Sequence, residues 1–316
     1  MVENDNYTGW KVWTPTGDEW FSFYEKQEVP FELLENEYLI VKTEDDYATT
    51  YCYENGVLRK FTGGSIKTVK DDRPVLEDPS TGIILPTRRP SKSKTKAKDG
   101  EEPVKYSKGK SIVLNPRNVE QACAFDLFKD RSKTIKVVTG TWGTGKTMIM
   151  VNAALEALSL GQFDKIIWIR NNVDTAGTKD MGALPGDAYE KLKPFLGPFR
   201  DHAGEMGTLT MIKKGTLVVE PLQYLRGRNF ENALIMCSEA ENLTKEHLQL
   251  IIARAAEGSE VWIDGDTRQR DKAIFEKSKG MESLIAKFKG NKLFGYVHLV
   301  RSERSETAAM ADLLND

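Results

Sequence analysis

A glycine-rich segment, residues 140–147, constrains the fold of this chain more than any other feature. It reads Gly-Thr-Trp-Gly-Thr-Gly-Lys-Thr, which follows the pattern G-x-x-x-x-G-K-[ST]. A β-branched run, Ile135–Val138, precedes it, and apolar residues at helical spacing follow it from Met148. Glycines let the backbone turn its N–H groups toward phosphate oxygens, and the N-terminus of the following helix adds its dipole. The segment therefore predicts a phosphate-binding loop between a strand and a helix.

The spacing of this pattern assigns a role to its last two residues. We expect Lys146 to reach the β- and γ-phosphates of a bound nucleotide and the hydroxyl of Thr147 to ligate Mg²⁺. A glycine-rich turn without a ligand is the alternative, and the flanking strand and helix argue against it. The residues expected at the nucleotide are Gly140, Thr141, Trp142, Gly143, Thr144, Gly145, Lys146 and Thr147.

Short apolar runs alternate with amphipathic stretches from residue 115 onward. The runs typical of strands cover residues 135–138, 165–169, 216–219, 233–237, 260–263 and 296–300, and helical spacing covers 119–128, 148–158, 245–256 and 281–288. Strands that alternate with helices predict right-handed crossovers and a mostly parallel sheet. Ligands of such sheets bind at the carboxyl ends of the strands. The expected fold class is therefore α/β, a P-loop NTPase with a mostly parallel sheet.

Residues 1–80 differ from the rest of the chain in charge and in aromatic content. They hold 17 Asp and Glu against 8 Lys and Arg, a net charge of −9, so the other residues carry +7 of the total of −2. Thirteen of the 29 aromatic residues lie between Tyr7 and Phe61. Short apolar runs flank turn residues, and Asn55-Gly56 is a strong hairpin signal. We expect a small all-β module with an aromatic core. Base stacking on an aromatic face is the alternative, which the acidic charge disfavours.

Residues 81–112 have the composition of a basic linker. Pro, Ser and Lys dominate residues 86–98, and no apolar periodicity is present. The stretch is either a solvated tether or an arm that contacts phosphates. The expected organisation is the small acidic module over residues 1–80, the flexible linker over 81–112 and the P-loop domain over 113–316.

The composition excludes several classes of protein. Apolar residues make up 40% and charged residues 29% of the chain, which is typical of a globular protein rather than a collagen or a disordered chain. The apolar stretches are shorter than ten residues and the N-terminus lacks an apolar core, so we expect neither a membrane span nor a signal peptide. Cys52, Cys123 and Cys237 stand far apart, which indicates buried thiols in a reducing, cytoplasmic setting.

From residue 114 onward the sequence resembles the PhoH family of ATPases. The resemblance rests on segments that occur in family order and together span about two thirds of the chain. They are 115–121 (Asn-Pro-Arg-Asn-Val-Glu-Gln), 182–194 (Gly-Ala-Leu-Pro-Gly-Asp-Ala-Tyr-Glu-Lys-Leu-Lys-Pro), 224–228 (Tyr-Leu-Arg-Gly-Arg), 265–269 (Gly-Asp-Thr-Arg-Gln) and 302–305 (Ser-Glu-Arg-Ser). The Leu-Pro-Gly-Asp stretch is specific to the family. The resemblance implies a helicase-like core with ATP and Mg²⁺ as cofactors.

The resemblance also implies roles for residues outside the loop. Gln121 matches the glutamine that reads adenine, since an amide both donates and accepts. Glu239 matches the residue that orients or deprotonates the attacking water. From their position after the strand at 260–263, Asp266 and Gln269 are expected to sense the γ-phosphate, and Arg304 is a candidate cation for it, in its own chain or across a subunit boundary. Without the resemblance, a surface glutamine and a solvated strand-end carboxylate would be the simpler interpretations.

Two positions depart from the family pattern. The family's acidic strand end reads Asp-Glu-Ala-Gln-Asn, whereas residues 238–242 read Ser-Glu-Ala-Glu-Asn. Ser238 therefore replaces the aspartate that helps to hold Mg²⁺, and its hydroxyl can act through a metal-bound water. Glu241 replaces a neutral residue, and the sequence does not show where its side chain points. Asn171 follows Arg170 where the family has proline.

These features favour one function and leave a second open. The resemblance implies that ATP hydrolysis is coupled to binding, remodelling or unwinding of single-stranded nucleic acid, RNA rather than DNA, and the +7 charge outside residues 1–80 agrees with that partner. Arg226, Arg228 and Arg170 are the expected nucleic-acid contacts. Ser238 favours the alternative, an ATP-dependent switch that hydrolyses poorly. The family also implies a homo-oligomer, expected as a hexameric ring, and the short stretch before Tyr7 leaves no room for a PIN nuclease domain.

Overall fold

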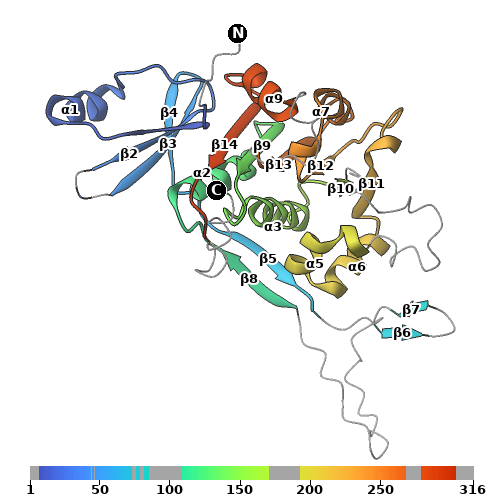
Figure 1. Cartoon of the computed structure of the whole chain (residues 1–316). Helices are drawn as coiled ribbons and strands as arrows, with labels where there is room; N and C mark the ends of the chain where they lie inside the picture. Colours follow the sequence, from blue (N-terminus) through green and yellow to red (C-terminus); the bar gives the residue numbers. More distant parts are fainter. Residues whose placement is uncertain are drawn as a thin grey trace, which may run out of the picture.

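A parallel β-sheet forms the centre of the protein (Figure 1). The computed structural model describes residues 7–43, 45, 47–72, 76–78, 82–84, 109–170, 193–267 and 279–303. The sheet has six strands in the order β11-β10-β12-β13-β9-β14, and every pair is parallel. The strands are β9 (Ile135–Gly140), β10 (Lys165–Arg170), β11 (Leu217–Pro221), β12 (Ala233–Cys237), β13 (Glu260–Gly265) and β14 (Phe294–Leu299). The α/β fold expected from the sequence is confirmed.

The order of the strands places β13 between β12 and β9. Cys237 at the end of β12 pairs with Ile263, and Val138 of β9 pairs with Asp264. Because all six strands run the same way, their carboxyl ends lie along one edge of the sheet, which is the edge where such folds bind ligands.

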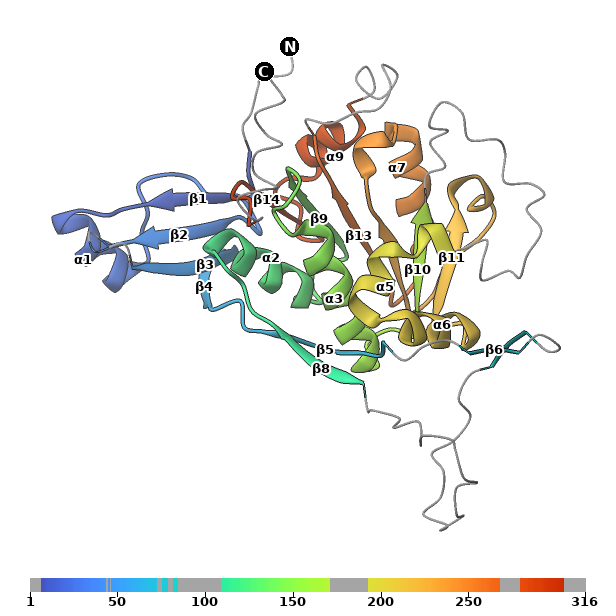
Figure 2. The ribbon, with the colours of Figure 1, turned by 60° about the horizontal axis from the view of Figure 1, so that its bottom comes forward.

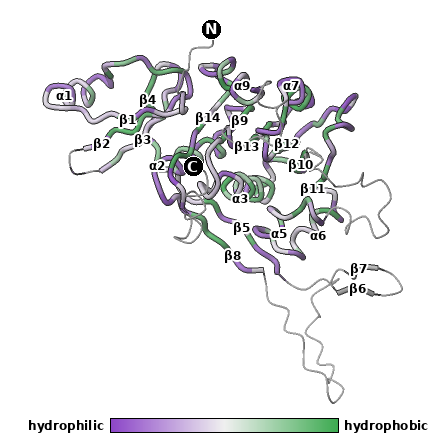
Figure 3. The backbone as a smooth tube through the Cα atoms, viewed as in Figure 1, coloured by the Kyte–Doolittle hydropathy of each residue, from purple (hydrophilic) through white to green (hydrophobic). Residues whose placement is uncertain are grey.

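Helices cover both faces of this sheet (Figure 2). Along β10, Ile166 and Trp168 belong to one hydrophobic cluster, while Ile167 and Ile169 belong to another, as the alternation of a strand requires. The first cluster lies under α2 (Val119–Lys129), α3 (Lys146–Ser159), α5 (Gly197–Ala203) and α6 (Glu205–Lys213), and the second under α7 (Lys245–Ile252) and α9 (Gly280–Phe288). Hydrophobic residues are concentrated in α3 and in the strands beside it (Figure 3). Burial of the first cluster fixes α3, and with it the loop that precedes it.

The N-terminal module is a four-stranded mixed sheet with one helix. Its strands are β1 (Trp10–Trp13), β2 (Tyr38–Lys42), β3 (Ala48–Glu54) and β4 (Val57–Phe61), with β1 and β2 parallel and the other pairs antiparallel. Asn55 and Gly56, both with positive φ, form the turn between β3 and β4, so the expected hairpin is confirmed. The module was expected to be all-β, but it also contains the helix α1 (Gly17–Lys26), which buries Phe23 in the core of the module.

The module packs against the edge strand β14. The side-chain amide of Asn36 donates to the backbone carbonyls of Asn291, Lys292 and Phe294 at 3.1, 3.1 and 2.9 Å. The indole N–H of Trp10 donates to the carbonyl of His298 at 2.8 Å. These contacts join residues far apart in the sequence.

Two short antiparallel strand pairs complete the described fold. Strand β5 (Ile66–Lys70) pairs antiparallel with β8 (Lys110–Leu114), and β6 (Leu76–Asp78) pairs with β7 (Gly82–Ile84). The hydroxyl of Thr68 donates to the side chain of Asn152 at 3.1 Å, which fastens β5 to α3. Most of the expected linker, residues 85–108, lies outside the described residues, so the division of the chain into units stays a prediction.

Two further expectations concern membranes and cysteines. Within the described ranges, none of the helices is both long and apolar enough to cross a membrane. Cys52, Cys123 and Cys237 are all free and buried, which confirms the expected buried thiols.

Candidate functional site

The glycine-rich loop connects β9 to α3, as the sequence predicts. Strand β9 ends at Gly140 and α3 begins at Lys146, with Gly145 as its N-cap residue. Gly143 and Gly145 have φ of 77° and 88°, in the left-handed region that side chains with a Cβ rarely adopt. The backbone conformation of the loop therefore depends on glycine at these two positions.

Hydrogen bonds within the loop hold its shape. The hydroxyl of Thr144 donates to the carbonyl of Thr141 at 2.8 Å, and the ammonium group of Lys146 donates to the same carbonyl at 3.3 Å. Thr147 lies in the first turn of α3. The long contact of Lys146 is one that a phosphate oxygen can replace, because an ion pair to phosphate is the stronger interaction.

A cavity of about 520 Å³ opens over the loop. Its size falls within the roughly 300–1,000 Å³ that small-molecule sites usually occupy. The residues that line it are Leu114, Asn115, Arg117, Gln121, Trp142, Gly143, Gly145, Lys146, Thr147, Met148 and Glu303. The cavity thus brings together the loop, the start of α2 and the chain after β14.

Gln121 fastens α2 to the loop. Its side-chain oxygen accepts the backbone N–H of Arg117 at 2.9 Å, and its amide N–H donates to the carbonyl of Thr144 at 3.0 Å. Asn118 caps α2 by accepting the N–H of Gln121 at 2.9 Å. Both ends of the Gln121 amide are therefore bonded to backbone, and the second N–H and the second lone pair of the amide remain for adenine reading, which stays a prediction.

The chain after β14 returns to the loop at Glu303. Its backbone N–H donates to the carbonyl of Gly143 at 2.9 Å, and its side chain accepts from the amide of Asn118 at 2.8 Å. The sequence reasoning gave Glu303 no role of its own. Arg304, the predicted cation, is the next residue and lies outside the described residues.

Ser238 and Glu239 follow β12 at the carboxyl edge of the sheet. Ser238 is buried, whereas the side chain of Glu239 is exposed. Glu239 has φ of 56°, a left-handed conformation that is uncommon for a residue other than glycine. Such strained positions cluster at functional sites. Glu239 therefore combines an exposed side chain with a strained backbone at the carboxyl edge of the sheet.

Asp264 is a site residue that the sequence reasoning missed. It lies at the end of β13, is fully buried, and accepts the backbone N–H of Glu239 at 3.3 Å. Burial raises its pKa, and the hydroxyls of Ser238 and Thr147 and the charge of Lys146 oppose this rise. The available signal was a carboxylate within an otherwise apolar strand, one residue before the Gly265-Asp266 motif.

Glu241 and Asp266 contact each other behind this edge. The carboxylate of Glu241 accepts the backbone N–H of Asp266 at 3.0 Å, which settles the direction that the sequence left open. Burial, with a smaller contribution from the charge of Asp264, raises the pKa of Glu241 to about 7. Asp266 is buried. Gln269, the other predicted sensor, lies outside the described residues.

The predicted nucleic-acid contacts follow β10 and β11, which lie toward the end of the strand order away from β9. Arg226 and Arg228 are exposed in the loop that follows β11. Arg228 forms an ion pair with Glu220 and lies over the ring of Phe230, 5.1 Å from its centroid. Arg170 ends β10, and its side chain lies outside the described part of the chain.

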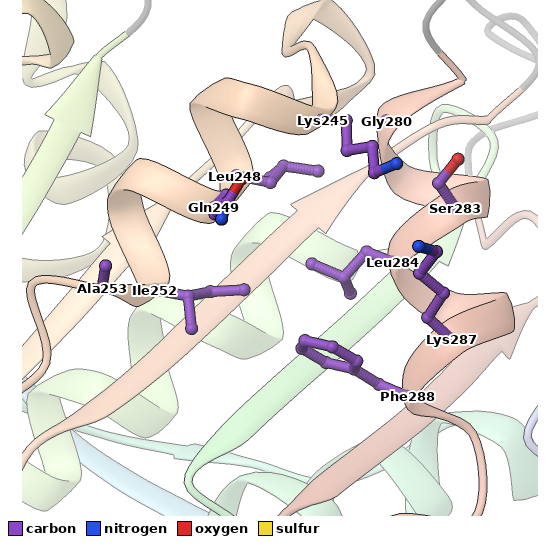
Figure 4. Close-up of a pocket in the computed structure, with 10 residues that line it drawn as sticks. All are labelled: Lys245, Leu248, Gln249, Ile252, Ala253, Gly280, Ser283, Leu284, Lys287 and Phe288. Atoms are coloured by element: carbon purple, nitrogen blue, oxygen red, sulfur yellow. The ribbon is translucent and has the colours of Figure 1, made fainter.

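A second hollow, of about 360 Å³, lies between α7 and α9 (Figure 4). Leu248 and Ile252 of α7 face Leu284 and Phe288 of α9 across it. None of the residues predicted for the nucleotide site is among those that line it. The cavity over the glycine-rich loop, which several of those residues line, is therefore the candidate nucleotide site.

A parallel sheet with a glycine-rich loop at a helix N-terminus defines a P-loop nucleotide-binding protein. Residues 113–312 match the family model described as PhoH-like protein, and the chain belongs to the PhoH family. It is 34% identical over 212 residues to Protein PhoH2 of Bacillus subtilis, which covers 64% of this chain and 48% of that protein.

Two other relatives show similar coverage. Protein PhoH2 of Mycolicibacterium smegmatis is 32% identical over 201 residues, 62% of this chain and 46% of that protein. A PhoH-like protein of Bacillus subtilis is 34% identical over 190 residues, 59% of this chain and 56% of that protein. The chain therefore spans about half the length of the curated relatives it matches.

Proposed function

We propose that this protein hydrolyses ATP and couples the reaction to binding or remodelling of single-stranded RNA. The observation that carries the proposal is the cavity over residues 140–147, lined by Lys146 and Thr147, at the same edge of the sheet as Glu239. Phosphoryl transfer needs a positioned nucleophile and cations on the phosphates rather than covalent chemistry by the protein. This edge offers side chains of both kinds.

Each residue of the site has a distinct task in this proposal. Lys146 exchanges the carbonyl of Thr141 for the β- and γ-phosphate oxygens. Glu239, exposed at the strand end, orients the attacking water and accepts its proton. The hydroxyl of Thr147 fits the oxygen ligands that Mg²⁺ prefers, and when bound, Mg²⁺ neutralises charge on the phosphates.

The nucleic-acid part of the proposal rests on charge. Residues 81–316 carry a net charge of +7, and two arginines follow β11 at the carboxyl edge. Arg226 is exposed and forms no ion pair with any described residue, so it is open to a phosphate contact. We extend the proposal to a homo-oligomeric ring in which Arg304 acts on the γ-phosphate of a neighbouring subunit.

A second candidate function is an ATP-dependent switch with little turnover. Ser238 favours it, because a neutral hydroxyl replaces the family's aspartate at the metal side of the site. In that case ATP binding, rather than hydrolysis, would change the affinity for RNA.

The experiment is steady-state ATP turnover with and without single-stranded RNA, on the wild type, Glu239→Gln and Glu231→Gln. Glu231 is an exposed glutamate before β12 and serves as the matched control. We expect RNA to stimulate the wild type and Glu239→Gln to lower turnover by about 10²–10⁴-fold, as loss of a general base does. Glu231→Gln should behave as wild type.

Two results would change the assignment. ATP binding without turnover at any RNA concentration would replace the proposed RNA-coupled ATPase with the ATP-dependent switch. ATP turnover that RNA does not stimulate, together with no salt-dependent RNA binding, would remove nucleic acid from the proposal. Binding through phosphate contacts weakens as the salt concentration rises.

A further inference from the structure

Ser238 leaves the expected Mg²⁺ position of the nucleotide site without the negative charge that an aspartate would supply there. In the family pattern an aspartate stands at this position, whereas serine carries no charge. Mg²⁺ in nucleotide sites is usually held by one or two carboxylates together with phosphate oxygens and water. A carboxylate from another strand could therefore serve.

The strand register places such a carboxylate beside Ser238. Cys237 pairs with Ile263, so the next residues along these parallel strands, Ser238 and Asp264, lie level with each other. On its other side Asp264 pairs with Val138. Asp264 thus lies one strand closer to the glycine-rich loop than Ser238 does, since β13 separates β12 from β9.

The side chain of Asp264 is directed to the face of the sheet that carries α3. Level residues of neighbouring strands point to the same face, and Val138 belongs to the hydrophobic cluster beneath α3. The first turn of α3, which contains Lys146 and Thr147, follows the loop at this edge of the sheet. The carboxyl therefore lies beside the end of β12, on the face of the sheet that carries the two residues that the loop presents to a nucleotide.

One oxygen of this carboxyl is unsatisfied. Asp264 is 0% exposed, and its Oδ1 accepts the backbone N–H of Glu239. Its Oδ2 is buried and has no hydrogen-bond partner among the described residues. Buried polar atoms nearly always have a partner, and an orphaned carboxylate oxygen is costly. A cation or a metal-bound water at this oxygen would remove that cost.

We propose that Asp264 supplies the carboxylate on the Mg²⁺ side of the nucleotide site, in place of the aspartate that the family has at position 238. The proposal rests on the proposed nucleotide binding and adds a residue to it. Asp264 has a second task as a positioning residue, because its bond to the N–H of Glu239 holds the turn that presents the Glu239 carboxylate.

The test measures how nucleotide affinity depends on Mg²⁺. A fluorescent, non-hydrolysable ATP analogue is titrated into the full chain at a series of Mg²⁺ concentrations and in EDTA. The variants are Asp264→Asn, the double variant Ser238→Asp/Asp264→Asn, which moves the carboxylate to the family's position, and Asp164→Asn, an exposed aspartate before β10. Binding of Mn²⁺, followed by loss of the free-ion EPR signal, gives a second readout that needs no turnover.

We expect Asp264→Asn to raise the Mg²⁺ concentration at half-effect by about tenfold or more, the usual consequence of losing a group that tunes a metal site. Its affinity in EDTA should not fall, since the variant removes a negative charge near the phosphates. The double variant should return the Mg²⁺ dependence to within about threefold of wild type. It keeps the wild-type charge, so it remains informative even where Asp264→Asn folds poorly. Asp164→Asn should match wild type.

Four outcomes would overturn the inference or the proposed function on which it rests. An unchanged Mg²⁺ dependence in Asp264→Asn would leave Asp264 with a structural role only. An equal loss of affinity with and without Mg²⁺, or a double variant that fails to recover, would do the same. Absence of nucleotide binding by the wild type at every Mg²⁺ concentration would instead refute the proposed function itself.

Discussion

The side-chain amide of Gln121 donates to the backbone carbonyl of Thr144 at 3.0 Å, which ties the first turn of α2 to the loop before α3. The other end of the amide accepts the N–H of Arg117. Gln121 is 2% exposed, so neither bond is open to competition from bulk water. The residue thus contributes to the shape of the loop before any nucleotide arrives.

Substitution of Gln121 separates anchoring of the loop from reading of the base. We expect Gln121→Ala to weaken binding of ATP and GTP by the same factor, about tenfold, because it removes two buried hydrogen bonds that shape the loop for any nucleotide. Equilibrium titration with both nucleotides measures this. Gln162→Ala, at an exposed glutamine, is the control. A loss confined to ATP would show that Gln121 reads adenine.

Asn36 is expected to govern the attachment of the N-terminal module. Its amide donates to the carbonyls of Asn291, Lys292 and Phe294, and the residue is 4% exposed. Asn36→Ala should lower the free energy of unfolding by about 2 kcal/mol, since it removes the side-chain donor to the buried carbonyl of Phe294 and to two part-buried carbonyls. Asn36→Asp should cost more, because a carboxylate would face those oxygens. Urea unfolding measures both, and equal stability of the two variants would contradict this account.

Gly9 shows how closely the module approaches β14. A Cβ at this position would overlap the backbone carbonyl of Tyr296, and φ is 78°. Gly9→Ala should therefore lower the free energy of unfolding by about 3 kcal/mol, the sum of steric overlap and backbone strain. Gly197→Ala is the control, because nothing lies within 4 Å of its Cβ position. A similar thermal midpoint for the two variants would argue against the close packing.

The buried ammonium group of Lys136 leads us to expect that the free energy of unfolding rises at alkaline pH. Its ammonium group contacts the carboxylate of Glu260 at 2.8 Å in the interior, and burial lowers its pKa to about 8. Between pH 8 and the ordinary pKa of lysine, the unfolded chain binds a proton that the folded protein has released, so the free energy of unfolding increases with pH. Below pH 8 both states are protonated, and the cost of the buried charge is fully present.

The measurement compares urea unfolding of the wild type and Lys136→Met at pH 8 and pH 10. We expect the stability of the wild type relative to the variant to increase by about 2 kcal/mol over this range. Lys60→Met, at an exposed lysine, controls for the titration of surface groups. A difference that stays constant with pH would mean that Lys136 keeps an ordinary pKa.

The central sheet was predictable because its signals are local. The run Ala233–Cys237 was expected as a strand and is β12, with every residue buried, since a central parallel strand is covered on both faces. The loop at 140–147 carries its own pattern, and the turn at Asn55-Gly56 needs nothing beyond two residues that tolerate positive φ.

The remaining features depend on contacts between distant segments. Helix α1 was missed because its aromatic residues suggested strands, whereas in the fold Phe23 packs into the core of the module. The pairing of β5 with β8 spans the linker, so no local pattern reports it. Asp264 gains its place from the register of β12 and β13, which the sequence of either strand alone does not contain.

The contact between Thr8 and His298 has a consequence for self-association. The backbone N–H of His298, in the edge strand β14, donates to the carbonyl of Thr8 at 2.9 Å. An exposed strand edge is a template on which another chain can add a strand, and proteins cover or shorten such edges. The N-terminal segment covers this one, and the opposite edge strand, β11, has five residues and ends at Pro221, which has no N–H to offer. Among the described strands, the central sheet thus has one edge partly occupied by the chain's own N-terminal segment and the other formed by a short strand, an arrangement that disfavours extension of this sheet by a second copy.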